Sequence, residues 1–138
     1  MLRLVATRGL PLLLILCVLA GCGDSGPSDE QRIRATLSSF ERAAAGHDYA
    51  ALCDGILAPK LIDAVEQIGL PCETALQKGF EDLRDPRLSV GAVTVDGDRA
   101  TAQVRSSAAG QSPSEDTVDL VRVGEGWRIA SLGGTGAG

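Results

Sequence analysis

The spacing of apolar residues changes halfway along this chain, and that change limits the fold more than any other feature. From residue 28 to 83, apolar side chains recur every three or four positions, which is the period of one helix face. From residue 88 to 131, apolar and polar side chains alternate, as they do in strands with one buried face. Helices first and consecutive strands second indicate an α+β fold, with N-terminal helices packed on a four-stranded antiparallel sheet.

Local signals divide the first half into four helices. Ser28 and Gln31 fit a capping box at the start of the first helix, and Gly46 is typical of a helix end. The third helix is expected to end at Gly69 and the fourth near Asp85. The later helices are expected to begin at Asp48, Pro59 and Pro71. The apolar face expected for the third helix consists of Leu61, Ile62, Val65 and Ile68.

The second half predicts four strands joined by turns. In the first strand the alternation slips at Gly91 and Ala92, which predicts a β-bulge. The next turn signal is Asp96-Gly97-Asp98. The second strand is expected to bury Ala100, Ala102 and Val104 and to expose Thr101, Gln103 and Arg105. A third strand is expected at 118–123, and a fourth with Trp127, Ile129 and Ser131 on one face.

The chain begins with the pattern of a secretory leader. Arg3 and Arg8 supply positive charge, and residues 10–20 form an apolar run that is shorter than the roughly 20 residues of a membrane-spanning helix. The run ends in Leu19-Ala20-Gly21-Cys22, which resembles the lipobox of bacterial lipoproteins. That resemblance implies cleavage before Cys22 and acyl chains, such as palmitate, on this residue. The alternative is an ordinary cleaved leader with an incidental cysteine.

These features define the expected domain organisation: a signal peptide at 1–21, a lipidated tether at 22–28, one domain at 29–133 and a flexible tail at 134–138. Removing the leader takes away two arginines and no acidic residue. The formal net charge then changes from −5 to −7, with 11 basic and 18 acidic residues. An acidic domain argues against nucleic acid as a partner. Contact with the cell membrane is expected only through the acyl chains on Cys22, on the extracytoplasmic side.

The cysteine count favours one disulfide. Cys17 leaves with the leader and Cys22 is taken by the lipid, so Cys53 and Cys72 remain as a pair. An oxidising compartment favours a bond between them, and two buried free thiols are the alternative. No metal site is expected, because two cysteines and the single histidine, His47, supply too few soft ligands. No other cofactor is expected.

Four features carry a resemblance to NTF2-like domains, the family of nuclear transport factor 2, ketosteroid isomerase and SnoaL-type cyclases. They are the amphipathic opening helix that ends at Gly46, the Gly46-His47-Asp48-Tyr49 step between helices, the segment 95–102 that enters a strand, and Gly126-Trp127-Arg128-Ile129 in the last strand. The resemblance spans 29–133 and implies a sheet curved around a helix into a cone with a cavity. The helical pattern of 57–83 departs from the many members that carry a strand or hairpin there.

Several residues of these segments have a structural interpretation that we favour over a functional one. Trp127 is expected to fill the core, and Tyr49 to be buried with its hydroxyl hydrogen-bonded. His47 is expected to be solvated in a turn, and Asp48 to cap a helix rather than act as an acid.

Enzymes of the resembling family place an Asp or an Asp/His pair inside the cone, where a carboxylate can abstract a proton. The candidates outside the caps are Asp63, Glu66, Glu73, Glu81 and Asp119. Asp63 and Glu66 fit the polar side of a helix, and Asp119 falls on the solvent face of its strand. We therefore assign no catalytic residue and expect a non-catalytic binding or accessory role. The alternative is a small-molecule isomerase or cyclase that acts in the cone cavity.

Two kinds of partner fit that expected role. A small apolar ligand could occupy the cone cavity. A protein partner, or a second copy of the chain, could pack on the outer face of the sheet, where Thr101, Gln103 and Arg105 are expected to be exposed.

Overall fold

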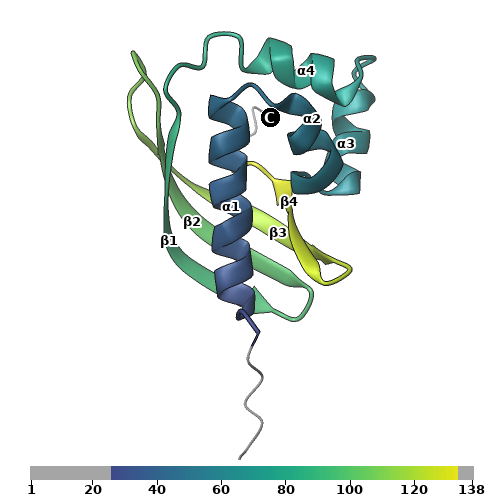
Figure 1. Ribbon diagram of the computed structural model, residues 1–138, viewed down its shortest axis with the longest axis vertical. Helices are drawn as coiled ribbons and strands as arrows, with labels where there is room; N and C mark the ends of the chain where they lie inside the picture. Colours follow the sequence, from purple (N-terminus) through teal and green to yellow (C-terminus); the bar gives the residue numbers. More distant parts are fainter. Residues whose placement is uncertain (1–25, 134–138) are drawn as a thin grey trace, which may run out of the picture.

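The computed structural model describes residues 26–133, which form two layers (Figure 1). Helices cover one face of a four-stranded antiparallel sheet with the order β1-β2-β3-β4, so the predicted α+β class is confirmed. The elements are α1 (Asp29–Ala45), α2 (Tyr49–Ala51), the π-helical segment η1 (Leu52–Ile56), α3 (Pro59–Glu66), α4 (Cys72–Gly79), β1 (Arg87–Asp96), β2 (Arg99–Ser107), β3 (Ser114–Val123) and β4 (Gly126–Ser131).

The expected leader, Cys22 and the expected tail at 134–138 lie outside the described residues. Within residues 26–133, no helix has the length and apolar character needed to cross a membrane.

Helix α1 lies across the inner face of the sheet and begins with the predicted capping box. The Ser28 hydroxyl accepts a hydrogen bond from the Gln31 N–H at 3.2 Å, and the Gln31 side chain accepts one from the Ser28 N–H at 2.8 Å. Ile33 and Leu37 are fully buried in the core. The helix ends at Gly46, as the sequence predicts.

The step from α1 into α2 places His47 and Tyr49 side by side. His47 adopts a left-handed backbone conformation, with φ 56°, and is exposed, as expected for a turn. Its Nδ1 lies 2.9 Å from the Tyr49 hydroxyl, and Tyr49 is half-buried. The Asp48 carboxylate accepts a hydrogen bond from the Ala51 N–H at 3.0 Å, which confirms its role as a cap.

After α2 the helix continues as η1, a π-helical turn with a wider coil, which was not predicted from the sequence. This turn buries Leu52 and Ile56. It brings the next residue, Leu57, into a parallel bridge with Ile129 of β4. The wider turn therefore allows one short segment to fill the core and to pair with the edge of the sheet.

Two helix ends differ from the sequence prediction. Helix α3 ends at Glu66, so Ile68 lies beyond it and is 70% exposed instead of belonging to the buried face. Helix α4 ends at Gly79 rather than near Asp85, because the following residues fold into turns. One of these turns is closed by a hydrogen bond of 3.0 Å from the Leu83 N–H to the Phe80 carbonyl.

The sheet follows the predicted alternation closely. The register of β1 shifts between Val90 and Val93, where a bulge was predicted, and Gly97 makes the β1–β2 turn with φ 59°. In β2 the buried residues are Ala100, Ala102 and Val104, and Thr101, Gln103 and Arg105 are exposed, both as predicted. Strand β3 begins at Ser114 rather than at 118, which brings Asp116 into the sheet.

An ionic cluster joins the start of α1 to the sheet. Asp29 accepts two hydrogen bonds from Arg122 of β3, at 3.1 and 2.8 Å, and one from the Trp127 indole N–H at 3.1 Å. The Arg122 guanidinium lies 4.5 Å from the centre of the Trp127 ring, and Trp127 fills the core as predicted, with 3% of its surface exposed. The hydrogen bonds from Arg122 and Trp127 lower the pKa of Asp29 from 3.8 to about 2.

Candidate functional site

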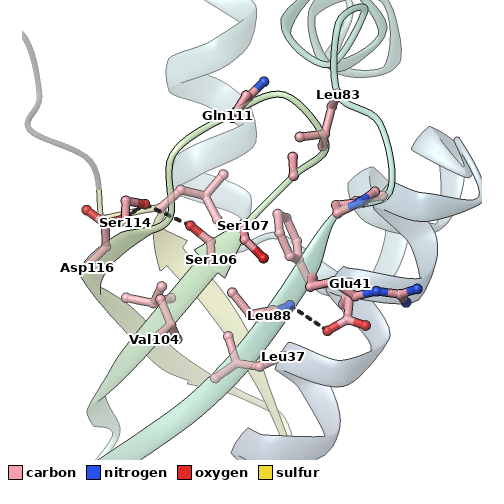
Figure 2. A pocket seen from close by; sticks show the side chains of 18 of the residues that line it. Leu37, Glu41, Leu83, Leu88, Val104, Ser106, Ser107, Gln111, Ser114 and Asp116 are labelled. Carbon is pink, nitrogen blue, oxygen red and sulfur yellow. Dashed lines mark hydrogen bonds between the residues drawn. The ribbon is translucent and has the colours of Figure 1, made fainter.

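A cavity of about 210 Å³ lies between α1, the segment that joins α4 to β1, and strands β2 and β3 (Figure 2). Its apolar lining includes Leu37, Phe40, Phe80, Leu88, Val104 and Val118. Exposed residues of the β2–β3 loop, among them Gln111 and Ser112, stand at its rim. Figure 1 shows this loop at the end of the molecule opposite to the start of α1.

Glu41 supplies a carboxylate to the α1 side of this pocket. It follows Leu37 by four residues and therefore lies on the same helix face. Its Oε2 accepts a hydrogen bond of 2.7 Å from the Leu88 backbone N–H of β1. This bond crosses from the helix to the edge strand of the sheet and fixes the direction of the Glu41 side chain.

A chain of hydroxyls ends on a second carboxylate, Asp116, at the β3 side. The Ser114 Oγ donates to Asp116 Oδ2 at 2.8 Å. Because Ser114 has a single hydroxyl proton, the 2.9 Å contact between Ser106 Oγ and Ser114 Oγ requires Ser106 to be the donor. Figure 2 shows Glu41 and Asp116 on opposite sides of the pocket, with Leu88, Val104 and Ser106 between them.

Three aromatic rings connect the helical layer to this pocket. Phe80 packs edge-on against Phe40, with ring centres 6.4 Å apart, and lies 6.3 Å from the Tyr49 ring. Phe80 directly follows α4, whose first residue, Cys72, is joined to Cys53 of η1 by a disulfide. The structure thus supports the expected cysteine pairing, and the bond holds the helix that positions one wall of the pocket.

Among the residues that the structure describes, no group of three or more His, Cys, Asp or Glu side chains could hold a metal ion.

Comparison with known proteins identifies the fold but no closer relative. No protein-family model and no curated protein matches the sequence. An NTF-2 like protein of unknown function from Silicibacter pomeroyi superposes with a TM-score of 0.52 at 21% identity, covering 72% of this chain and 87% of that chain. A de novo designed NTF2 fold protein gives a TM-score of 0.52 at 17% identity, with coverage of 80% and 90%. An NTF2-like protein from Campylobacter jejuni gives 0.51 at 10% identity, with coverage of 72% and 98%.

The chain has an NTF2-like fold. Identities this low carry the fold alone, so the chemistry of the site must be argued from this chain's own residues. In this NTF2-like domain the expected cone interior is the pocket described above. The segment 57–83, predicted to be helical, contains the helices α3 and α4, but Leu57 lies in a bridge to β4 and residues 67–71 and 80–83 are not helical.

The carboxylates that the sequence analysis considered for catalysis lie outside this pocket. All five are exposed, and none lines it: Asp63, Glu66, Glu73, Glu81 and Asp119. Glu66 accepts a 3.4 Å hydrogen bond from the Cys72 N–H, and Asp119 accepts one of 2.7 Å from the Ser131 hydroxyl. The structure therefore brings none of them together at a site.

Sequence reasoning missed the two carboxylates that do line the pocket, although the periodicity carried the signal. Glu41 stands four residues after the buried Leu37, on the core side of α1. Asp116 precedes the buried Val118 by two residues and so shares its face of the strand. In both elements, a charged residue stands where the helical or strand pattern calls for an apolar one, and this mismatch was the available signal for a polar group on the inner face.

Proposed function

We propose that this NTF2-like domain binds a small, largely apolar molecule in the pocket between α1, β2 and β3. We propose further that it does so as a non-catalytic lipoprotein, held by acyl chains on Cys22 at the extracytoplasmic side of a cell membrane. The observation that carries the binding role is the apolar cavity of about 210 Å³ among the described residues, with exposed residues of the β2–β3 loop in its lining. A tightly packed core leaves few voids larger than a water molecule.

The size of the pocket limits the class of ligand. An apolar protein cavity of about 150 Å³ stays dry and takes up benzene. The present cavity, at about 210 Å³, is somewhat larger and opens to solvent at its rim. It suits a molecule with one substituted ring or a short alkyl chain, and it lies below the volume of roughly 300–1,000 Å³ that is typical for drug-sized ligands.

The arrangement of polar groups favours binding over catalysis. A serine nucleophile generally requires a base such as histidine. The single histidine of the chain, His47, does not line this pocket. The hydroxyls of Ser106 and Ser114 instead form a chain that ends on a carboxylate. An isomerase or cyclase that uses Glu41 or Asp116 as a base is the alternative, and it would require turnover of the bound ligand.

A dye-binding experiment tests the binding role. The neutral, single-ring fluorescent dye 4-(dimethylamino)benzonitrile is expected to give saturable, one-to-one binding to the protein. Ser106→Phe adds a ring at the pocket wall and should abolish this signal. The matched control is Gln103→Phe on the same strand, whose side chain lies on the outer face and should leave binding unchanged. Equal binding by both variants, or no saturable binding by the unmodified protein, would contradict the proposal.

Membrane anchoring is tested separately in cells. The Cys22→Ala variant should lose its acyl chains and be released or misprocessed, because two or more chains on Cys22 account for the proposed stable attachment. Fractionation and intact mass of the mature protein measure this outcome. Unchanged membrane retention together with an unchanged mature mass would refute the anchor without affecting the dye experiment.

A further inference from the structure

We propose that the ligand of this pocket is an amphipathic organic cation, with a small apolar body and an ammonium head. This inference rests on the proposed binding function and names its ligand class. The site is the apolar cavity itself, and the polar groups on its walls decide which head group it accepts.

The ionisable groups on the pocket wall are mainly acidic. Glu41 and Asp116 are half-buried and stand on opposite sides of the cavity (Figure 2). Arg87 also lines the cavity, but it is exposed. Its guanidinium forms no ion pair within 4 Å of either carboxylate in the described part of the chain.

Both carboxylates are oriented by neutral donors, and neither has a cationic partner within 4 Å among residues 26–133. Glu41 accepts from a backbone N–H, and Asp116 accepts from a serine hydroxyl. The ion pairs found among residues 26–133 involve other acids, namely Asp29, Glu30, Asp98 and Glu115. Because Glu41 and Asp116 are only half-buried, their remaining oxygen lone pairs are accessible to solvation by water.

An entering ligand must replace part of that water. Removing water from an ionised carboxylate is costly unless a partner of opposite charge takes its place. A ligand with an ammonium head supplies such a partner, whereas an alcohol supplies only a neutral donor and a carboxylate adds a like charge. The walls thus discriminate between head groups as well as accept an apolar body.

The aromatic side chains that line the pocket also favour a cationic ligand. Phe40 and Phe80 both line the cavity and pack edge-on, with ring centres 6.4 Å apart. The faces of phenyl rings attract a cation within about 6 Å, most strongly where water is excluded. A cationic head and a short apolar chain are therefore both complementary to this pocket.

The test compares three ligands that share one apolar chain, hexylammonium, hexanol and hexanoate, by displacement of the dye from the full protein at low salt and pH 7. Hexylammonium should bind at least tenfold more tightly than hexanol, and hexanoate should be the weakest. The double variant Glu41→Gln/Asp116→Asn should reduce hexylammonium binding to the level of hexanol while hexanol binding stays the same. Glu115→Gln is the control, because it removes one negative charge from the exposed position next to Asp116. It should leave the preference intact.

Each result has one meaning. Equal affinity for hexylammonium and hexanol overturns the cationic ligand class and leaves the apolar pocket standing. A preference for hexylammonium that survives in the double variant overturns the assignment to Glu41 and Asp116. Failure of the unmodified protein to bind the dye and all three ligands overturns the proposed function as well.

Discussion

Reduction of the Cys53–Cys72 disulfide is expected to destabilise the domain by about 3 kcal/mol. The bond joins residues 19 positions apart, and closing a loop of that length removes about 11 cal/mol/K of entropy from the unfolded chain. At 25 °C this entropy corresponds to about 3 kcal/mol, a large part of the 5–15 kcal/mol by which domains are usually stable. For a domain of this size the melting temperature should fall by about 12 °C.

The chain has a built-in probe for this measurement. Trp127 is the single tryptophan and is 3% exposed, so its fluorescence will change when the core opens. Urea titrations with and without a phosphine reductant give the difference in unfolding free energy. A Cys53→Ala/Cys72→Ala variant is the control, since the reductant should not alter its stability.

Peptide mapping without reduction should first detect Cys53 and Cys72 in one linked fragment. Coincident urea midpoints for oxidised and reduced protein would refute the loop-entropy argument. Two freely alkylated thiols in the unreduced protein would refute the bond itself.

Two further substitutions test the packing of α1. Asp29→Asn should lower the free energy of unfolding at pH 7, because the folded state depresses the pKa of Asp29 to about 2. The ionised Asp29 carboxylate therefore stabilises the fold above the unfolded pKa of 3.8, and this stabilisation is lost as the pH falls toward 2. Urea midpoints of the variant and the unmodified protein should therefore differ at pH 7 and converge near pH 2, and a constant difference would contradict this assignment. Leu37→Ala should lower the free energy of unfolding by about 2–5 kcal/mol and enlarge the pocket, because Leu37 is fully buried and lines the pocket. The control is Ser38→Ala on the exposed side of α1, which should change the free energy of unfolding by less than about 0.5 kcal/mol.

The sequence predicted those parts of the fold that local chemistry decides. The Ser28 capping box, the Asp48 cap and the Gly97 turn depend on neighbours within three residues, and all three are formed. The bulge in β1 was likewise visible as a shift in the alternation between Val90 and Val93.

Features that depend on distant contacts were not predicted. The π-helical turn of η1 exists because Leu52 and Ile56 must enter the core while Leu57 reaches Ile129, far along the chain. Ile68 continues an apolar helical pattern, yet α3 ends before it, so periodicity alone gave the wrong burial.

The site was missed for a different reason. The alternation that correctly placed Asp119 on the solvent face also places Asp116 on the inner face, provided that the strand is known to begin at Ser114. The expected strand began at residue 118, so this carboxylate was not considered.

The ionic cluster at the start of α1 has a mechanical consequence for a tethered protein. With the proposed anchor at Cys22, any pull from the membrane enters the described fold near Ser28, one residue before Asp29. Asp29 is bound to Arg122 of β3, an inner strand flanked by β2 and β4. Tension applied at Ser28 would therefore load strand β3 together with the first turn of α1. Because β3 also carries Asp116 and Val118, the strand that would take this load also forms part of the pocket wall.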